Sequence, residues 1–238
     1  MSSKPSASTA GSNWEALQKE LKREKTHHKV QFKTIKKEKK VTHKVNRFKA
    51  AHSEAMKALK GGDSKAVTDV LALDCEYVGV GYNGNVDQLA RVSIVNSEGK
   101  VVYDKYVAPR EEVTDYRTHV SGIRPGHLVL GMPFNQVQQE VNKLIRNKIV
   151  VGHGLANDFR VMNLSHPQRL TRDSANWKPL RKMIDYTGKP SLKFLAQKLL
   201  NIRIQEGEHD SIIDAKAALR IYQLHKKRWD SDIKGAKR

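Results

Sequence analysis

Two acidic residues, Asp74 and Glu76, stand in the middle of a short apolar run at positions 71–79 (LALDCEYVG). A short apolar run that ends at glycine is typical of a buried β-strand. Because successive side chains of a strand point to opposite faces, the two carboxylates share one face, and Cys75 and Tyr77 share the other. Neighbouring buried carboxylates repel each other and are costly to desolvate. The strand therefore predicts a compensating positive charge, from a divalent cation or a nearby Arg or Lys, unless it ends where both acids reach water.

The charge of the chain indicates what it binds. Its 238 residues include 44 Lys and Arg against 25 Asp and Glu, which gives a formal net charge of +19, and the excess is densest before residue 69. Such a basic chain is typical of proteins that bind a polyanion, most often a nucleic acid, with an anionic membrane surface as the rival. No run approaches the roughly 20 apolar residues of a membrane-spanning helix, so we expect no membrane association. The single cysteine excludes an intramolecular disulfide and a cysteine-rich zinc site.

The composition changes along the chain in a way that predicts its domain organisation. Residues 1–65 are polar, Lys-rich and sparse in apolar side chains, so we expect a basic extension that is disordered or partly helical. Its segment 33–40 (KTIKKEKK) is either a nuclear-localisation or phosphate-binding patch or a solvated linker. We expect the folded domain at 66–230 and a basic C-terminal tail at 231–238.

Hydrophobic periodicity within the folded domain predicts an α/β architecture. Strands are predicted at 68–78, 88–96 and 100–107, and the short links between them favour an antiparallel meander. After a loop-like stretch with three prolines (108–133), the pattern predicts a helix at 134–147, a buried strand at 148–151, a helix that carries Asp158, a strand at 169–173, and helices at 191–200 and 211–229. This order of elements predicts a mixed β-sheet flanked by helices.

Two further acidic residues are candidates to join the pair on the first strand. Asp158 follows the turn Gly-His-Gly at 152–154, and Asp214 lies in the first turn of the last helix. Ligands of open α/β sheets gather at the carboxyl ends of strands, so we expect these acids and the strand pair around one cleft. Carboxylate oxygens suit hard cations such as Mg²⁺ or Mn²⁺, and two such ions form the clamp that many enzymes use to hydrolyse phosphodiesters.

Each of these residues also has a simpler structural interpretation. Asp158 is able to cap its own helix or to face solvent. Asp214 completes the capping-box pattern Ser211-x-x-Asp214, and the helix dipole favours an acid in the first turn. His209 is suited to accept a proton from water near neutral pH, although a lone histidine is more often structural. What favours function is the ordered set Asp-x-Glu, Gly-His-Gly-x-x-x-Asp and His-x-x-x-x-Asp.

This ordered set resembles the three motifs of the DEDD exonuclease superfamily, and its last motif resembles the histidine subclass. Within that superfamily, further stretches are similar to the eukaryotic RNA exonuclease 4 family: 72–81 (ALDCEYVGVG), 89–96 (LARVSIVN), 113–123 (VTDYRTHVSGI) and 204–209 (IQEGEH). The resemblance extends over about residues 70–229. One departure is Tyr77, where close relatives often carry Met. Because Tyr77 lies on the face opposite the acidic pair, we expect catalysis to survive this change.

The resemblance implies a ribonuclease H-like fold and a metal-dependent 3′–5′ exoribonuclease that releases 5′-monophosphates. It implies His209 as the general base and two Mg²⁺ or Mn²⁺ ions held by four carboxylates, those of Asp74, Glu76, Asp158 and Asp214. It also implies a nuclear, and in particular nucleolar, protein that processes ribosomal RNA precursors. Substrate contacts are expected next to the first motif, at Tyr77, Val78 and Gly79. His153 and Phe159 are candidates to stack on a base, although core packing explains Phe159 equally well.

Two other functions are compatible with the same sequence. A DNA exonuclease of the same superfamily would use the same residues, because they do not select the sugar. A non-catalytic RNA-binding factor in ribosome assembly would keep the fold around a vestigial site. The complete set of motifs argues against this last alternative, since a degenerate site is expected to have lost a ligand.

Overall fold

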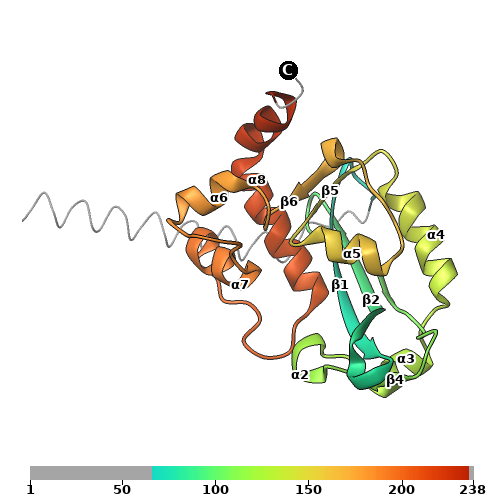
Figure 1. Ribbon diagram of the computed structural model, residues 1–238. Coiled ribbons are helices and arrows are strands. Elements are labelled where there is room, and N and C mark those ends of the chain that lie inside the picture. The colour runs from blue at the N-terminus through green and yellow to red at the C-terminus, as the bar shows by residue number, and fades with distance from the viewer. Residues whose placement is uncertain (1–65, 236–238) are drawn as a thin grey trace, which may run out of the picture. The chain divides into compact units, whose positions relative to one another are not determined.

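The computed structural model describes residues 66–235, which form a six-stranded mixed β-sheet with helices on its faces (Figure 1). The strand order is β3-β2-β1-β5-β6, and β4 pairs with β1. The predicted α/β architecture is therefore confirmed. The expectations for the basic extension at 1–65 fall outside the described residues. Every helix within 66–235 is too short or too polar to cross a membrane.

The first three strands form the predicted antiparallel meander. β1 (Val70–Val80) pairs with β2 (Val86–Asn96), which pairs with β3 (Val101–Tyr106). A short 3-10 turn, η1 (Tyr82–Gly84), lies in the link between β1 and β2. The register of β1 against β2 shifts between Glu76, which is opposite Arg91, and Tyr77, which is opposite Leu89. Such a bulge changes the direction of the strand immediately after the acidic pair.

The parallel half of the sheet is formed by β5 (Ile149–Gly152) and β6 (Thr171–Asp173). β5 pairs with β1 only along 70–72, and β4 (Val113–Asp115) pairs with β1 only at Gly79 and Val80. Among the described strands, none therefore lies beside residues 73–78 on this side of β1. The gap leaves the edge of β1 open next to the acidic pair, so side chains from helices are able to approach it.

Helices cover both faces of the sheet, and the alternation of β1 decides which residues each face receives. Leu71, Leu73 and Cys75 pack with α4 (Phe134–Ile145) and α5 (Leu155–Val161) in one core cluster. Ala72 packs on the other face with α7 (Leu192–Leu195) and α8 (Ser211–Gly235). The acidic pair is in phase with Ala72, so it points toward the face that α8 covers, as the alternation predicts.

The stretch 108–133 is more structured than its prolines suggest. Besides β4 it contains two short helices, α2 (Thr118–Ser121) and α3 (Pro125–Val129). Pro125 begins α3, at a position where its missing N–H is not needed. Helices of four or five residues do not produce a visible hydrophobic period, so the sequence pattern does not reveal them. The same holds for α6 (Lys178–Met183) and for η2 (Gln168–Leu170), and the helix predicted at 191–200 is α7 followed by a π-helical turn, η3 (Ala196–Leu200).

The last helix is longer than predicted. α8 continues to Gly235 rather than to about 229, so the predicted start of a C-terminal tail at 231 needs correction. The indole rings of Trp177 and Trp229 stack with centroids 4.3 Å apart, and Trp177 Nε1 donates a hydrogen bond of 3.1 Å to Asp232. Ile233 also packs against the core cluster of α8. These contacts extend the helix beyond the last strongly apolar turn.

Candidate active site

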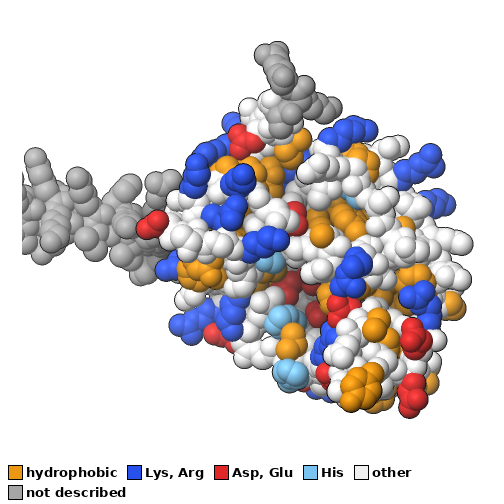
Figure 2. Space-filling view, in the orientation of Figure 1, with side chains coloured by type: hydrophobic (Ala, Val, Ile, Leu, Met, Phe, Trp, Pro, Cys, Tyr) orange, Lys and Arg blue, Asp and Glu red, His pale blue; other side chains and the backbone are white. Residues whose placement is uncertain are grey.

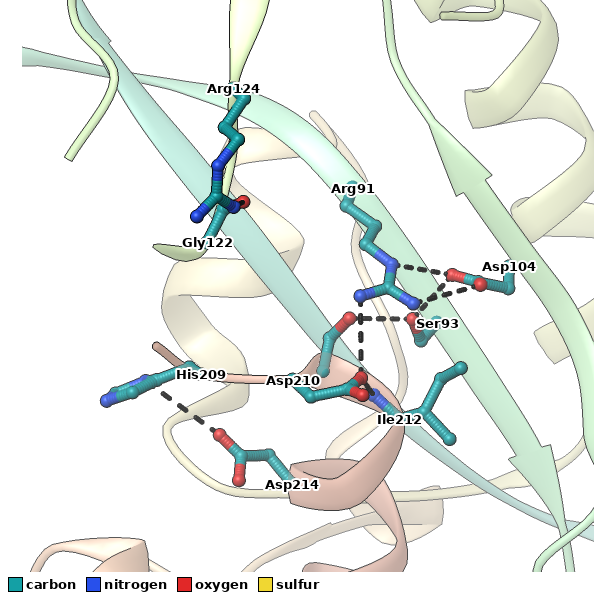
Figure 3. Close-up of polar contacts among 10 residues, drawn as sticks. Arg91, Ser93, Asp104, Gly122, Arg124, His209, Asp210, Ile212 and Asp214 are labelled. Atoms are coloured by element: carbon teal, nitrogen blue, oxygen red, sulfur yellow. Dashed lines mark hydrogen bonds and ion pairs between the residues drawn. The ribbon is translucent and has the colours of Figure 1, made fainter. Parts of the chain in front are cut away.

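The acidic pair of β1 lies beside the beginning of α8. Glu76 is buried, with 6% of its surface exposed, and Asp74 is partly buried. Asp74 is opposite Ser93 on β2, as Glu76 is opposite Arg91. Both β2 residues belong to a polar network that reaches the start of α8 (Figure 3). The sheet and the helix are therefore joined at the position of the acids.

Asp214 lies in the first turn of α8 with only 3% of its surface exposed. The cap of this helix is a different residue, because the carboxylate of Asp210 accepts the backbone N–H of Ile212 over 3.0 Å. The hydroxyl of Ser211 instead shares a hydrogen bond of 2.7 Å with the hydroxyl of Ser93. The capping-box interpretation of Ser211 and Asp214 is therefore wrong, and capping does not explain the buried acid.

His209 lies in the loop that leads into α8. Its Nδ1 is 3.9 Å from Oδ2 of Asp214, and Figure 3 shows the imidazole beside this carboxylate. Its backbone N–H donates a hydrogen bond of 2.7 Å to the carbonyl of Val120, which fixes the loop. Burial and the nearby charge of Lys193 lower the pKa of His209. The imidazole is therefore neutral near pH 7 and able to accept a proton.

Asp158 reaches the open edge of β1 from α5. Gly152 ends β5, and a Cβ at this position would lie 2.4 Å from Cδ2 of Leu155, so glycine allows α5 to begin directly against the sheet. Asp158 is 2% exposed, which excludes its interpretation as a solvated helix acid. The hydroxyl of Tyr77 donates a hydrogen bond of 2.6 Å to Oδ1 of Asp158.

The contact with Asp158 gives Tyr77 a role that was not predicted from the sequence. The ring of Tyr77 packs with the α4–α5 core cluster, on the face opposite the acidic pair, as predicted. Its hydroxyl nevertheless binds one of the predicted metal ligands. The predicted face is therefore confirmed, and the expectation that catalysis survives a tyrosine here stays a prediction. Strand alternation gives the correct face, but the gap beside residues 73–78 lets Asp158 approach from that same face.

The pKa values of the carboxyl groups reflect their burial and mutual repulsion. Burial, followed by repulsion from Asp158 and Asp214 and then Glu76, raises the pKa of Asp74 well above its ordinary value. Burial and repulsion from Asp214 raise the pKa of Glu76 to about 8, while the charge of Arg91 opposes the shift. Burial raises the pKa of Asp158 and of Asp214 to about 6 each. These mutual effects show that the predicted metal ligands lie together.

The donor chemistry of this cluster fits hard divalent cations. Oε1 of Glu76 and Oδ1 of Asp214 are buried without a hydrogen-bond partner, which is unusual for carboxylate oxygens unless an ion or another group satisfies them. The other oxygen of Asp214 accepts a hydrogen bond of 2.6 Å from Gln205. Within residues 66–235, no three His, Cys, Asp or Glu side chains are arranged to hold an ion as they stand. Ion binding therefore requires the acids to draw together, which a divalent charge among repelling carboxylates favours.

The sequence predicts either a metal ion or a nearby Arg or Lys beside the acidic pair. Arg91 is such a neighbouring cation. Its guanidinium donates two hydrogen bonds to Asp104, of 2.8 and 3.0 Å, and a longer one of 3.4 Å to Asp210 (Figure 3). An arginine that already binds two carboxylates does not neutralise the remaining acids. The site therefore keeps an excess of negative charge. Figure 2 shows acidic side chains in a recess of the surface, with histidines beside them and Lys and Arg around them.

Three of the predicted substrate contacts, Val78, Gly79 and His153, lie at the ends of β1 and β5. Val78 is fully buried in a small core cluster, and a Cβ at Gly79 would lie 2.5 Å from the carbonyl oxygen of Gly84. Both residues therefore offer backbone rather than side-chain contacts. Nδ1 of His153 shares a hydrogen bond of 2.9 Å with the hydroxyl of Ser174, and burial lowers the pKa of this histidine.

Phe159 lies on a different side of α5 from the acidic cluster. Its ring stacks on His166 with centroids 5.7 Å apart and packs partly against the α4–α5 core cluster. Together with Leu155 and Trp177 it lines a pocket of about 380 Å³, which none of the predicted metal ligands lines. Packing is therefore sufficient to explain Phe159, and its stacking on a base stays a prediction.

Three residues that contact the predicted ligands or their loop were not predicted. Gln205 and Asp210 lie in and next to the stretch 204–209, which the resemblance had identified without assigning roles to them. Arg91 lies in the stretch 89–96, but its place opposite Glu76 depends on the register between two strands. No periodicity in the sequence specifies that register to one residue.

Comparisons with known proteins show what most of this chain is similar to. The exonuclease family model RNase_T matches residues 71–222. RNA exonuclease 4 of Xenopus laevis is 50% identical over 170 residues, which are 71% of this chain and 40% of that protein. The Homo sapiens protein of the same name is 51% identical over 165 residues, or 69% and 39%. The chain thus spans about 40% of the length of these curated relatives. The Pan2 module of Saccharomyces cerevisiae solved with A7 RNA aligns with a TM-score of 0.58 and 32% identity, covering 70% of this chain and 30% of that one.

Proposed function

This chain belongs to the RNase_T exonuclease family, and on that premise we propose that it is a 3′–5′ exoribonuclease that releases 5′-monophosphates. One observation carries the proposal: the predicted carboxylates repel one another, and two of their buried oxygens, on Glu76 and Asp214, lack hydrogen-bond partners. A structural acidic cluster would be expected to satisfy such oxygens within the protein. A site that takes cations and phosphate would leave them free.

We propose that the cluster holds two Mg²⁺ ions, or Mn²⁺ in their place, through Asp74, Glu76, Asp158 and Asp214. Bound there, such a pair would activate a water molecule and stabilise the leaving 3′ oxygen of the scissile phosphodiester. The contribution of the chain is to orient the ligands. Gln205 holds one oxygen of Asp214, and Tyr77 holds one oxygen of Asp158.

His209 is the proposed general base. The lowered pKa of its imidazole keeps the ring neutral near pH 7, the form that takes a proton from an attacking water. Its side chain keeps 29% exposure, so it is reachable from the cleft. The hydrogen bond from its backbone to Val120 limits the movement of the loop. A base on a tethered loop next to Asp214 is well placed to act on water near that ligand.

The RNA substrate is supported by the name of the relatives, RNA exonuclease 4, and by the basic character of the chain. We extend the proposal to ribosomal RNA precursors as substrates and to the nucleus, in particular the nucleolus, as the location. The support for this extension is the resemblance to the RNA exonuclease 4 family together with the Lys-rich segment 33–40.

Product analysis with matched substrates tests the proposed reaction. RNA and DNA oligonucleotides of the same sequence are incubated with the protein in Mg²⁺ or in EDTA, and the released nucleotides are identified by chromatography. The proposal expects 5′-monophosphates from RNA in Mg²⁺, much slower release from DNA, and none in EDTA. Equal release from DNA would support the DNA exonuclease alternative. RNA binding in Mg²⁺ without release of nucleotides would support the non-catalytic factor.

A further inference from the structure

A charged network joins the start of α8 to the sheet. It begins on β3, the outermost antiparallel strand of the sheet. Asp104 on β3 accepts two hydrogen bonds from Arg91 on β2, from Nε over 2.8 Å and from Nη2 over 3.0 Å. This is the forked geometry in which arginine and a carboxylate fix each other's orientation. The side chain of Arg91 is only 14% exposed, so water screens the pair weakly.

Two connections lead from this pair to α8 (Figure 3). Arg91 donates to the capping carboxylate of Asp210 over 3.4 Å. Ser93 donates to Asp104 over 2.8 Å and shares a hydrogen bond of 2.7 Å with Ser211, and both serines are fully buried. The serine connection is the stronger of the two, because its hydrogen bonds are short and both serines are buried away from water.

The residues held by this network directly flank the proposed catalytic groups. Asp210 and Ser211 follow His209 in the chain, and the backbone N–H of Asp214 donates to the carbonyl of Asp210 over 2.9 Å. On the other side, Arg91 is the cross-strand neighbour of Glu76. The network therefore sets the distance between a ligand on the sheet and the two groups at the start of the helix.

An ion pair elsewhere in the His209 loop is more exposed. Glu208 pairs with Arg124 over 2.6 Å, but the two side chains are 43% and 52% exposed. Exposed ion pairs of this kind contribute little rigidity or stability. The position of the loop therefore depends more on the buried network and on the backbone hydrogen bond from His209 to Val120 than on this ion pair.

We propose that Asp104 and Arg91 are positioning residues that hold His209 and Asp214 in register with Glu76, an inference that rests on the proposed function. Neither touches the proposed metal ligands through a hydrogen bond in the network described, so they act through Asp210, Ser93 and Ser211. Loss of the Asp104 charge frees Arg91 to turn toward the remaining acids. The helix start then shifts relative to β1, while residues that bind RNA elsewhere keep their places.

A second arginine–aspartate pair provides a matched control. Arg172 on β6 pairs with Asp230 near the other end of α8 over 2.9 Å, and its side chain is 5% exposed. This pair also joins the sheet to α8, but it lies away from His209. The variants Asp104→Asn and Asp230→Asn thus remove the same kind of interaction at two ends of one helix.

The test compares both variants with wild type below their melting temperatures, using kcat and KM on a short RNA and Mn²⁺ affinity by electron paramagnetic resonance. Loss of a positioning partner typically lowers metal affinity or activity by about 10–100-fold. We expect that range for kcat and for Mn²⁺ affinity in Asp104→Asn, a KM close to wild type, and no such change in Asp230→Asn despite a comparable loss of Tm.

Unchanged kcat and Mn²⁺ affinity in Asp104→Asn, or an equal loss in both variants, would overturn the proposal. If Asp104→Asn does not fold, Ser211→Ala decides in its place, since it removes the serine connection and keeps the ion pair. A smaller loss of Mn²⁺ affinity is then expected, and wild-type affinity contradicts the proposal. A wild-type protein that binds Mn²⁺ but degrades no RNA would refute the proposed function, while the Mn²⁺ comparison would still test the positioning role.

Discussion

The hydroxyl of Tyr77 donates a hydrogen bond of 2.6 Å to Oδ1 of Asp158, across the open edge of β1. The two residues are 81 positions apart in the sequence and come from β1 and α5. Burial and the neighbouring charge of Asp158 raise the pKa of the Tyr77 phenol, so it remains a donor at neutral pH. A methionine at this position would offer no such donor. In this chain Tyr77 therefore orients a carboxylate that is a proposed metal ligand.

Replacing this donor is expected to weaken the metal site. Tyr77→Phe keeps the packed ring and removes the hydrogen bond, so we expect Mn²⁺ affinity to fall about tenfold, as is typical when the partner of a ligand is lost. Tyr103→Phe is the matched control, because Tyr103 donates over 2.8 Å to Glu140, away from the cluster. Isothermal titration with Mn²⁺ measures both variants. Equal affinities for Tyr77→Phe and wild type would show that Asp158 is oriented without the phenol.

The proposed general base can be separated from the metal ligands. His209→Ala is expected to slow the chemical step by roughly 10²–10⁴-fold, the usual contribution of general-base catalysis. The backbone N–H that binds Val120 is retained in this variant, so the loop should keep its position and Mn²⁺ affinity should stay near wild type. Single-turnover kinetics on a short RNA give the rate. A rate equal to that of wild type would remove His209 from the mechanism.

The raised pKa values predict how the stability of the metal-free protein depends on pH. The pKa of Glu76 is raised to about 8 in the folded protein against an ordinary 4.5, so between these values Glu76 binds more protons in the folded state than in the unfolded state. Glu76 therefore lowers stability as pH rises through this window, by at most about 1.4 kcal/mol per pH unit. The histidines whose pKa burial lowers act in the opposite direction near their ordinary pKa, so the contribution of Glu76 has to be isolated from theirs.

Thermal unfolding of wild type and Glu76→Gln in EDTA at pH 6 and pH 8 checks this sign, because the histidines titrate in both proteins. Glu76→Gln should raise the Tm at pH 8 more than at pH 6, so the two proteins should differ most at pH 8. Excess Mg²⁺ should raise the Tm of wild type at pH 8, because a bound cation favours the ionised carboxylates. A metal-free Tm that changes between pH 6 and pH 8 in the same way in wild type and Glu76→Gln would contradict the electrostatic description of the cluster.

Much of this arrangement could be predicted from the sequence because it depends on local patterns. Alternation along β1 predicts the common face of Asp74 and Glu76, and the short links predict the meander. The order of the motifs predicts that Asp158 and Asp214 join them. These inferences need only the period of a strand and the position of acids at element starts.

The contacts that tune the site depend on relations between distant segments. Arg91 lies opposite Glu76 because of the pairing register of β1 and β2, which shifts between Glu76 and Tyr77. Tyr77 contacts Asp158 because β5 pairs with β1 only along 70–72 and leaves the following part of the β1 edge open. The extension of α8 depends on the stacking of Trp177 on Trp229. Tertiary packing decides each of these, so no local pattern in the sequence reveals them.

The most direct measurement of the central claim is a time course on a 5′-labelled single-stranded RNA with wild-type protein and with Asp74→Asn, each in Mg²⁺ and in EDTA. Asp74→Asn keeps the size of the side chain and relieves repulsion in the cluster, so the variant should fold, which its Tm verifies. We predict a ladder that shortens from the 3′ end with wild-type protein in Mg²⁺ alone. Shortening at the wild-type rate by folded Asp74→Asn, or by wild type in EDTA, would contradict a metal-dependent exonuclease site at this edge of the sheet.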